Sequence, residues 1–164
     1  MRLPCKRRQR RSPTLWLLRL LCLALLLAST AAHAAPDLKT AAARARDVAQ
    51  RLQAALDPDQ KGWVTMAAAI LEDGTLIIAT SEKGRYLRSP VDDIRRAERA
   101  DVADGPPGCA ERKIINYIRT DLFRRNKKIL VVAAGRPICE PCEQAILADG
   151  AKPAGRCKSG RSYL

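Results

Sequence analysis

The chain has 164 residues, 47% of them hydrophobic and 29% charged, which is enough for one domain with a hydrophobic core. Aromatic residues make up only 4%, which argues against a broad platform for stacking nucleobases. The formal net charge is +13, and the smaller excess that remains without residues 1–34 is compatible with a polyanionic substrate such as nucleic acid, although many basic proteins bind none.

Residues 1–34 have the pattern of a cleaved secretory signal peptide. Six basic side chains in residues 2–11 precede an apolar run over residues 15–27, and Ala32-His33-Ala34 fits the small-x-small rule for cleavage. The apolar run is short for a membrane-spanning helix. We therefore expect cleavage after Ala34, a secreted or periplasmic protein and no stable membrane insertion of the mature chain. An uncleaved anchor is the alternative.

Loss of these residues changes the composition of the mature chain. They hold seven of the 30 Lys and Arg and none of the 17 Asp and Glu, so the formal charge of residues 35–164 is +6. They also contain His33, the only histidine, and two of the six cysteines. Any metal site in the mature chain must therefore use thiolates or carboxylates. The four remaining cysteines also permit two disulfides.

The first elements after the leader are predicted to be a helix and a β-hairpin. Residues 37–56 carry apolar side chains at helical spacing. Residues 63–71 and 75–80 are two apolar runs joined through Asp73-Gly74, a strong hairpin signal. The alanines at 67–69 are poor strand formers, but their small side chains would let a helix pack closely on the sheet.

The second half of the chain is predicted to alternate between helices and strands. Residues 92–103 fit either a short charged helix or a loose loop. A helix should then begin at Cys109 or Ala110, with Lys113 mostly outside its apolar stripe. That stripe is formed by Ile114, Ile115, Ile118 and Leu122.

The last elements follow a clear buried strand. Residues 128–134 form the cleanest buried strand of the chain, and a helix is expected over residues 140–147 with Pro141 in its first turn. The tail from Asp149 either adds a short strand or frays.

Two cysteine motifs carry the chemistry. Cys109 stands two residues before Glu111, and Cys139 and Cys142 are three residues apart. Three thiolates can hold a zinc ion and leave its fourth position to water, while a carboxylate moves protons. All three cysteines lie at expected helix N-termini, where the positive end of the macrodipole should lower the thiol pKa and favour thiolates.

These motifs resemble the zinc-dependent cytidine deaminase-like superfamily, in which a His-or-Cys, Ala, Glu element is followed by Pro-Cys-x-x-Cys. The run Gly135-Arg136-Pro137-Ile138-Cys139, with Cys142, is especially similar to deaminase domains of bacterial polymorphic toxins. Cys109 stands where the toxin motif more commonly has His, as in free-nucleoside cytidine deaminases, so the motif leaves the substrate open.

The resemblance implies an α/β, three-layer-like deaminase fold, in which a mixed sheet of the hairpin and the following strands carries packed helices. The expected organisation is a signal peptide over residues 1–34, an N-terminal helix over residues 35–60 and a deaminase-like zinc domain over residues 61–164. The chain ends soon after the second metal-binding helix, which leaves little sequence for the further strands usual in that superfamily.

The resemblance also implies the activity, which is hydrolytic deamination of a nucleobase in nucleic acid or in a nucleotide by a toxin-like effector. The cofactor would be Zn²⁺ on Cys109, Cys139 and Cys142, zinc-bound water the nucleophile and Glu111 the proton shuttle. Because three thiolates and Zn²⁺ sum to −1, a cation should lie nearby, and Arg136 and Arg112 are the candidates. A protective immunity protein would be a partner.

Two other functions fit the same cysteines. The chain could be a non-catalytic, basic exported module stapled by structural zinc or by disulfides, or a thiol–disulfide oxidoreductase that uses Cys139 and Cys142. Cys157 is expected to be a free tail cysteine rather than a fourth ligand, which would close the site to water.

The remaining charged residues have simpler interpretations. Glu140 and Glu143 are interpreted as charges at the start of a helix. A basic set near the end of the first metal-binding helix is expected to be a solvated face, with a phosphate-binding patch as the alternative. Its members are Arg119, Arg124, Arg125, Lys127 and Lys128.

Overall fold

The computed structural model describes residues 36–82 and 87–164. The predicted signal peptide, residues 1–34, lies outside these residues, so the leader and its cleavage stay predictions. These described residues form one compact unit by their contacts. Within the described part of the chain, no helix has the length and apolar character needed to cross a membrane.

The predicted order of helices and strands is confirmed, with small shifts at the ends. Asp37 begins the first helix as its N-cap, with its side chain accepting a hydrogen bond from the Thr40 N–H at 3.3 Å. Gly74, with φ of 81°, makes the predicted hairpin turn. The elements are α2 (Leu38–Ala54), β1 (Met66–Leu71), β2 (Leu76–Thr80), α3 (Val91–Glu98), β3 (Asp101–Val102), α4 (Ala110–Thr120), β4 (Ile129–Ala134), α5 (Glu140–Ala148) and β5 (Lys152–Ala154).

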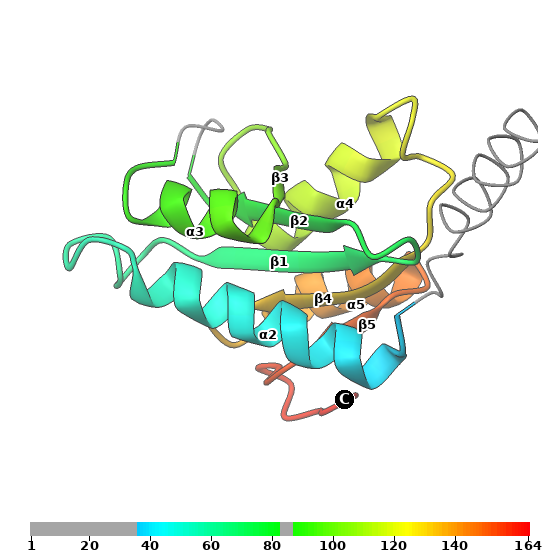
Figure 1. Ribbon diagram of the computed structural model, residues 1–164. Coiled ribbons are helices and arrows are strands. Elements are labelled where there is room, and N and C mark those ends of the chain that lie inside the picture. Colours follow the sequence, from blue (N-terminus) through cyan, green and yellow to red (C-terminus); the bar gives the residue numbers. More distant parts are fainter. Residues whose placement is uncertain (1–35, 83–86) are drawn as a thin grey trace, which may run out of the picture. The chain divides into compact units, whose positions relative to one another are not determined.

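The five strands form one mixed sheet in the order β3-β2-β1-β4-β5, as Figure 1 shows. The central strand β1 runs antiparallel to both β2 and β4, while β2 pairs with β3 and β4 pairs with β5 in parallel. The expected α/β class with a mixed sheet is therefore confirmed. The tail contributes β5. Residues 92–103, for which a helix and a loop were both considered, contain most of α3 and all of β3.

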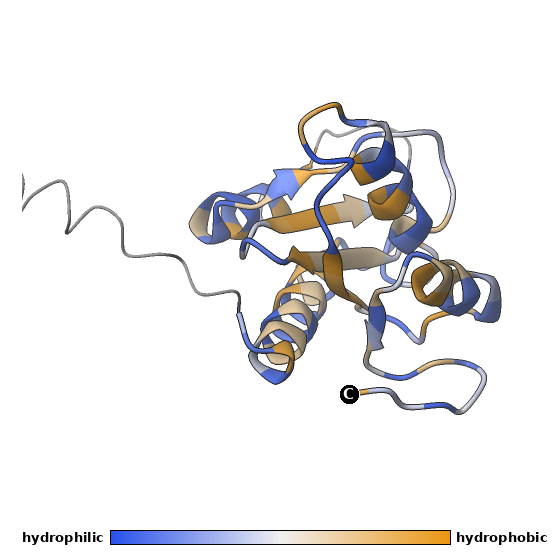
Figure 2. Cartoon of the chain, turned by 90° about the vertical axis from the view of Figure 1, so that its right-hand side faces the viewer, coloured by the Kyte–Doolittle hydropathy of each residue, from blue (hydrophilic) through white to orange (hydrophobic). Residues whose placement is uncertain are grey.

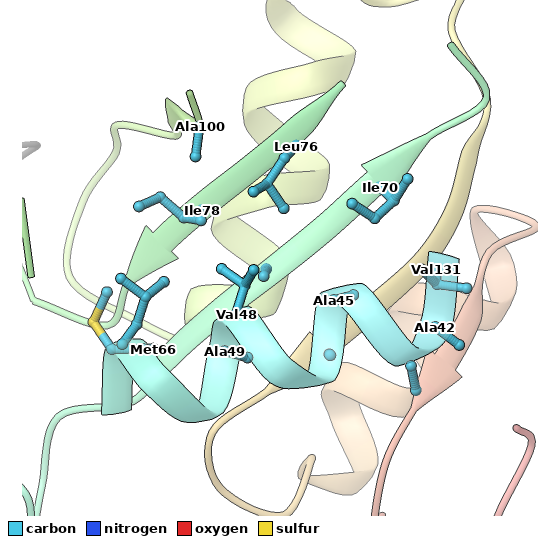
Figure 3. Packing of buried hydrophobic residues seen from close by; sticks show 14 of the residues in the cluster. Ala42, Ala45, Val48, Ala49, Met66, Ile70, Leu76, Ile78, Ala100 and Val131 are labelled. Carbon is cyan, nitrogen blue, oxygen red and sulfur yellow. The ribbon is translucent and has the colours of Figure 1, made fainter. Parts of the chain in front are cut away.

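One face of the sheet is covered by α2. Figure 3 shows Ala42, Ala45, Val48 and Ala49 of this helix directed toward side chains of β1, β2 and β4. Alanines on both sides of the contact shorten the distance between helix and sheet. The N-terminal helix is thus a structural layer of the same core as the sheet, with α3 packed at its edge.

The opposite face is covered by α4 and α5. Ala67 and Ala69 of β1 point to this side, where they pack with Ile114 and Ile118 of α4 and Ile146 of α5. Figure 2 shows that hydrophobic residues gather on the strands and on the sides of the helices turned toward them. The small residues of β1 therefore allow helices to pack closely on both faces of the sheet. On this face, the packed helices are the two that carry the cysteines.

Two details of α4 correct the prediction. The helix ends at Thr120 because the Asp121 side chain accepts hydrogen bonds from the backbone N–H groups of Phe123 and Arg124, which starts a new turn. Leu122 is therefore 73% exposed and is not part of the apolar stripe. Lys113, expected outside that stripe, is buried, and its ammonium group donates to the carbonyl oxygen of Glu82.

Candidate metal centre

The three motif cysteines meet at the N-termini of two helices. Cys109 is the N-cap of α4, and Cys139 is the N-cap of α5. Cys142 lies in the first turn of α5, where its N–H donates to the carbonyl oxygen of Cys139 at 3.0 Å. Pro141 fits this first turn because its missing N–H is not needed there. The packing of α4 and α5 on one face of the sheet brings these two helix starts together.

The loop before α4 is fixed to the open end of the hairpin. The Gly108 N–H donates to the carbonyl oxygen of Ser81 at 3.1 Å. Ser81 is itself joined to Thr65, because its N–H donates to the Thr65 carbonyl oxygen and its hydroxyl accepts from the Thr65 N–H, both at 2.9 Å. This chain of hydrogen bonds sets the position of Cys109 relative to the sheet.

The sulfur atoms have the spacing of a metal-binding group. The Sγ atoms of Cys109, Cys139 and Cys142 all lie within 4.8 Å of one another, and those of Cys109 and Cys139 are 4.0 Å apart. In a tetrahedral site with Zn–S bonds of about 2.3 Å, the sulfurs would be about 3.8 Å apart. The donor set therefore fits a soft, thiolate-binding metal with a contraction of about 1 Å or less.

Cys157 stays outside this group. It is buried beneath the turn before α5, where it pairs with Ile138 in an isolated parallel bridge. All four cysteines of the described chain are free thiols. The structure therefore places three sulfurs around the candidate metal position.

The pKa of Cys142 corrects one electrostatic expectation. Burial raises the pKa of this thiol, and the neighbouring Cys139 and Glu111 raise it further, whereas a lowered pKa was expected at the helix N-terminus. A metal must then displace the proton, and binding would release it.

Glu111 lines a cavity that opens onto the sulfurs. The cavity has a volume of about 390 Å³, and its walls include Cys109, Cys139, Trp63 and Arg136. Glu111 is buried, with only 4% of its surface exposed. Burial raises the pKa of Glu111, against a smaller opposing effect of its backbone N–H and of the Cys142 thiol. A carboxyl with a raised pKa is better suited than an ordinary one to taking up and releasing a proton.

The two candidate cations occupy different positions. Arg136 lines the cavity of Glu111, and its guanidinium donates to the carbonyl oxygen of Gly62 at 2.9 Å. Arg112 lines a neighbouring hollow that it shares with Cys109. Lys158, which the sequence did not single out, lines the same cavity as Glu111 and Arg136. Its position depends on the tail folding back beside the turn before α5, a contact that no local motif indicates.

Glu143 has a role that the sequence did not reveal. It is completely buried, although it was interpreted as a charge at a helix start. Its carboxylate accepts hydrogen bonds from the hydroxyls of Ser159 at 2.5 Å and Tyr163 at 2.6 Å. These bonds lower the pKa of Glu143, against the opposing effect of burial. The residue after Cys142 therefore fastens the tail to the first turn of α5.

The basic set predicted near the end of α4 is largely engaged in ion pairs. Arg119 pairs with Asp149 and Arg124 with Asp101, each at 2.6 Å, and Lys127 pairs with Asp73. Their charges are neutralised within the protein, which argues against a phosphate-binding patch there.

No protein-family model, no curated protein and no solved structure matches this chain. A group of three cysteines is common to several kinds of metal site, so it does not by itself identify an activity. What distinguishes this one is the buried carboxylate in the cavity beside it.

Proposed function

We propose that the protein is an exported, zinc-dependent hydrolytic deaminase that acts on a nucleobase in nucleic acid or in a nucleotide. One observation carries the proposal: the sulfurs of Cys109, Cys139 and Cys142 gather within 4.8 Å at two helix N-termini, and the Glu111 carboxyl lines the cavity beside them. A purely structural metal site needs no buried acid in an open cavity at its side.

The order of elements supports the same function. In the cytidine deaminase-like superfamily, which the motifs resemble, the first metal ligand lies at the start of the helix after the hairpin, and the other two lie at the start of the next helix. Here Cys109 precedes α4, which follows the β1–β2 hairpin after α3 and β3, and Cys139 and Cys142 begin α5.

The cysteines and Glu111 have separate tasks. Three thiolates would hold Zn²⁺ and leave one position open, and the bound ion would supply Lewis-acid activation of a water molecule. Glu111 takes the proton from the attacking water and passes protons to the ring nitrogen and to the departing amine. In the overall reaction, a C–O bond forms at the ring carbon and the bond from that carbon to the amine nitrogen breaks. The amine-bearing carbon and water are thereby converted into a carbonyl group and ammonia.

Cations in the cavity offset the charge of the centre. Three thiolates and one Zn²⁺ sum to −1, which would make the activated water less acidic than in a site with neutral ligands. Arg136 and Lys158 line the cavity and supply positive charge on its walls. Arg112 contributes from the neighbouring hollow.

The wider proposal is that of a secreted or periplasmic toxin-like effector. The leader pattern in residues 1–34 supports export. A producing cell would then need a protective partner, which is the immunity protein implied by the resemblance to polymorphic toxins.

Release of ammonia tests the reaction. The purified protein is incubated with cytosine- and adenine-containing nucleosides, nucleotides, and single-stranded DNA and RNA, and the substrate that responds is used for the variants. We expect Glu111→Gln to lower the rate by about 10²-fold or more, since general acid–base groups contribute about 10²–10⁴-fold. Glu140→Gln is the matched control, because Glu140 is an exposed acid in the first turn of α5, as Glu111 is in the first turn of α4, but lies outside the cavity.

The outcomes separate the rival functions. An unchanged rate in Glu111→Gln would end the proposed mechanism. Reduction of insulin disulfides that Cys139→Ser abolishes and zinc chelation leaves intact would instead identify a thiol–disulfide oxidoreductase.

A further inference from the structure

Three exposed cations lie at the cavity of Glu111 and at the hollow next to it. Arg136, Arg156 and Lys158 are exposed, and within the part of the chain that the structure describes none of them forms an ion pair. In contrast, Arg119 and Arg124 are held by acids. Unpaired cations gathered at one place keep their charge available for an external anion.

These cations extend over two adjoining hollows. Arg136 and Lys158 line the cavity that contains Glu111. Arg136 and Pro137 also line a second hollow of about 440 Å³, which includes Arg156. Glu111 carries the only acidic side chain among the described residues that line either of them. Because the two hollows share Arg136, the three cations form a strip that leads from the carboxyl in the cavity to the second hollow.

The backbone holds the strip in place. The N–H of Ile138 donates to the carbonyl oxygen of Arg156 at 2.9 Å, and the N–H of Lys158 donates to the carbonyl oxygen of Ile138 at 2.8 Å. Cys157, between these two cations, is buried. Because side chains alternate along an extended segment, Arg156 and Lys158 point outward on the same side. These cations thus project from backbone that is fixed by hydrogen bonds, which reduces the conformational entropy lost when they bind a ligand.

A large aromatic side chain stands at the same place. Trp63 lines the cavity of Glu111 and is 62% exposed, which is unusual for a Trp in a chain with so few aromatic residues. The guanidinium of Arg136 is bonded to the carbonyl oxygen of Gly62, next to Trp63. A flat ring beside cations is the combination with which proteins hold unpaired bases and their phosphates.

We propose that Trp63, Arg136, Arg156 and Lys158, here called the basic surface, bind a single-stranded nucleic acid and hold the phosphates that flank the base in the cavity. This inference rests on the proposed function, since it takes the base in the cavity as the substrate. A free nucleotide carries its phosphates at one point, whereas the cations span two hollows, so only a strand contacts them all. A base stacked in a duplex would not reach Glu111, which is 4% exposed at the inner wall of the cavity.

Fluorescence anisotropy without turnover tests the basic surface. The probes are labelled single-stranded DNA and RNA of about 12 nucleotides, with a duplex of the same sequence and free CMP and AMP as competitors. We expect the single strands to bind, the duplex to bind at least about tenfold more weakly, and the mononucleotides not to displace the strand at matched nucleotide concentration.

Variants assign the binding to the named residues. Arg136→Ala, Arg156→Ala and Lys158→Ala should each weaken binding by about three- to tenfold and reduce the salt dependence by about one phosphate contact. Trp63→Ala should weaken it by about tenfold. The matched controls are Arg125→Ala and Lys128→Ala, exposed cations of the rival basic set that form no ion pair in the described structure; these should bind as the wild type does.

Each outcome decides for or against the basic surface. Equal losses in the controls, efficient displacement by a mononucleotide, or no binding of single strands would overturn it. If free nucleosides release ammonia but the four variants bind strands like the wild type, the reaction stands and the basic surface does not. If Glu111→Gln leaves ammonia release unchanged while strand binding follows the four residues, the basic surface stands and the reaction does not.

Discussion

At the scale of single residues, two neighbours in the first turn of α5 have opposite surroundings. Cys142 is turned toward the other two site sulfurs. Glu143 points instead to the tail and is closed in by the hydroxyls of Ser159 and Tyr163. The tail also contains Lys158, which lines the cavity. By fixing the tail, the carboxylate of Glu143 helps to position Lys158 without contacting it. Glu143 is therefore a positioning residue.

Replacement of Glu143 should loosen the tail. In Glu143→Gln the two hydroxyls lose a charged acceptor, and charge-assisted hydrogen bonds are roughly twice as strong as neutral ones. We expect a lower urea midpoint of unfolding and faster amide exchange over residues 155–164. Tyr163→Phe removes one of the two bonds, so the double variant should lose less stability than the sum of the single variants. Additive effects would show that the two residues do not interact.

The stabilising effect of Glu143 should depend on pH in a definite direction. Ser159 and Tyr163 hold the pKa of Glu143 below its usual value of 4.5. A carboxyl whose pKa is lowered by folding stabilises the fold above its unfolded pKa, and this contribution is lost as the pH falls through the folded pKa. The difference in urea midpoint between wild type and Glu143→Gln should thus be full at pH 7 and shrink below about pH 4.5. A constant difference from pH 7 to pH 3 would contradict this assignment.

At the scale of elements, the close contact between α2 and the end of β4 explains a glycine. A Cβ added at Gly135 would lie 2.4 Å from the Cβ of Gln53 and 2.8 Å from the carbonyl oxygen of Ala49. Gln53 in turn donates to the Val64 carbonyl oxygen and accepts from the Met66 N–H, both at 2.9 Å. The segment that leads from the sheet to Arg136 and Cys139 is therefore pressed directly against α2.

Addition of one methyl group tests this contact. Gly135→Ala should destabilise the protein by about 1–3 kcal/mol, the usual cost of overpacking, because helix backbone cannot move aside as a flexible side chain can. Chemical denaturation measures the change. Gly62→Ala is the control, since a Cβ there meets nothing within 4 Å. Equal stability of the two variants would mean that α2 does not pack on this turn.

The starts and turns of the elements could be predicted from the sequence, whereas features set by single side chains or by distant partners could not. Local signals placed the hairpin at Asp73-Gly74 and the starts of both cysteine helices, because turns and helix starts depend on a few adjacent residues. The end of α4 was wrong because the side chain of Asp121, and not the apolar pattern, ends the helix. The partners of Glu143 were missed because they lie 16 and 20 residues away along the chain.

At the scale of the whole molecule, one sheet brings distant motifs together. Periodicity and local signals do not say whether residues 30 positions apart meet, and only the resemblance predicted that Cys109 and Cys139 share a site. The antiparallel pairing of β1 with β4 and the packing of α4 and α5 on one face set these two cysteines side by side. The number of ligands also depends on tertiary structure. Cys157 was expected to be a free tail cysteine, and the structure agrees, since its bridge to Ile138 buries it away from the three sulfurs.

The central claim is a three-thiolate zinc centre, and the metal content of the purified protein tests it most directly. We predict one zinc per chain in the wild type and in Cys157→Ser, and almost none in Cys139→Ser, with circular dichroism used to compare the folding of the three proteins. Zinc that is lost with Cys157→Ser in a folded protein would indicate a closed, structural site. A folded wild type with no zinc and no titratable thiols would mean that the cysteines are disulfide staples, and the proposed chemistry would be wrong.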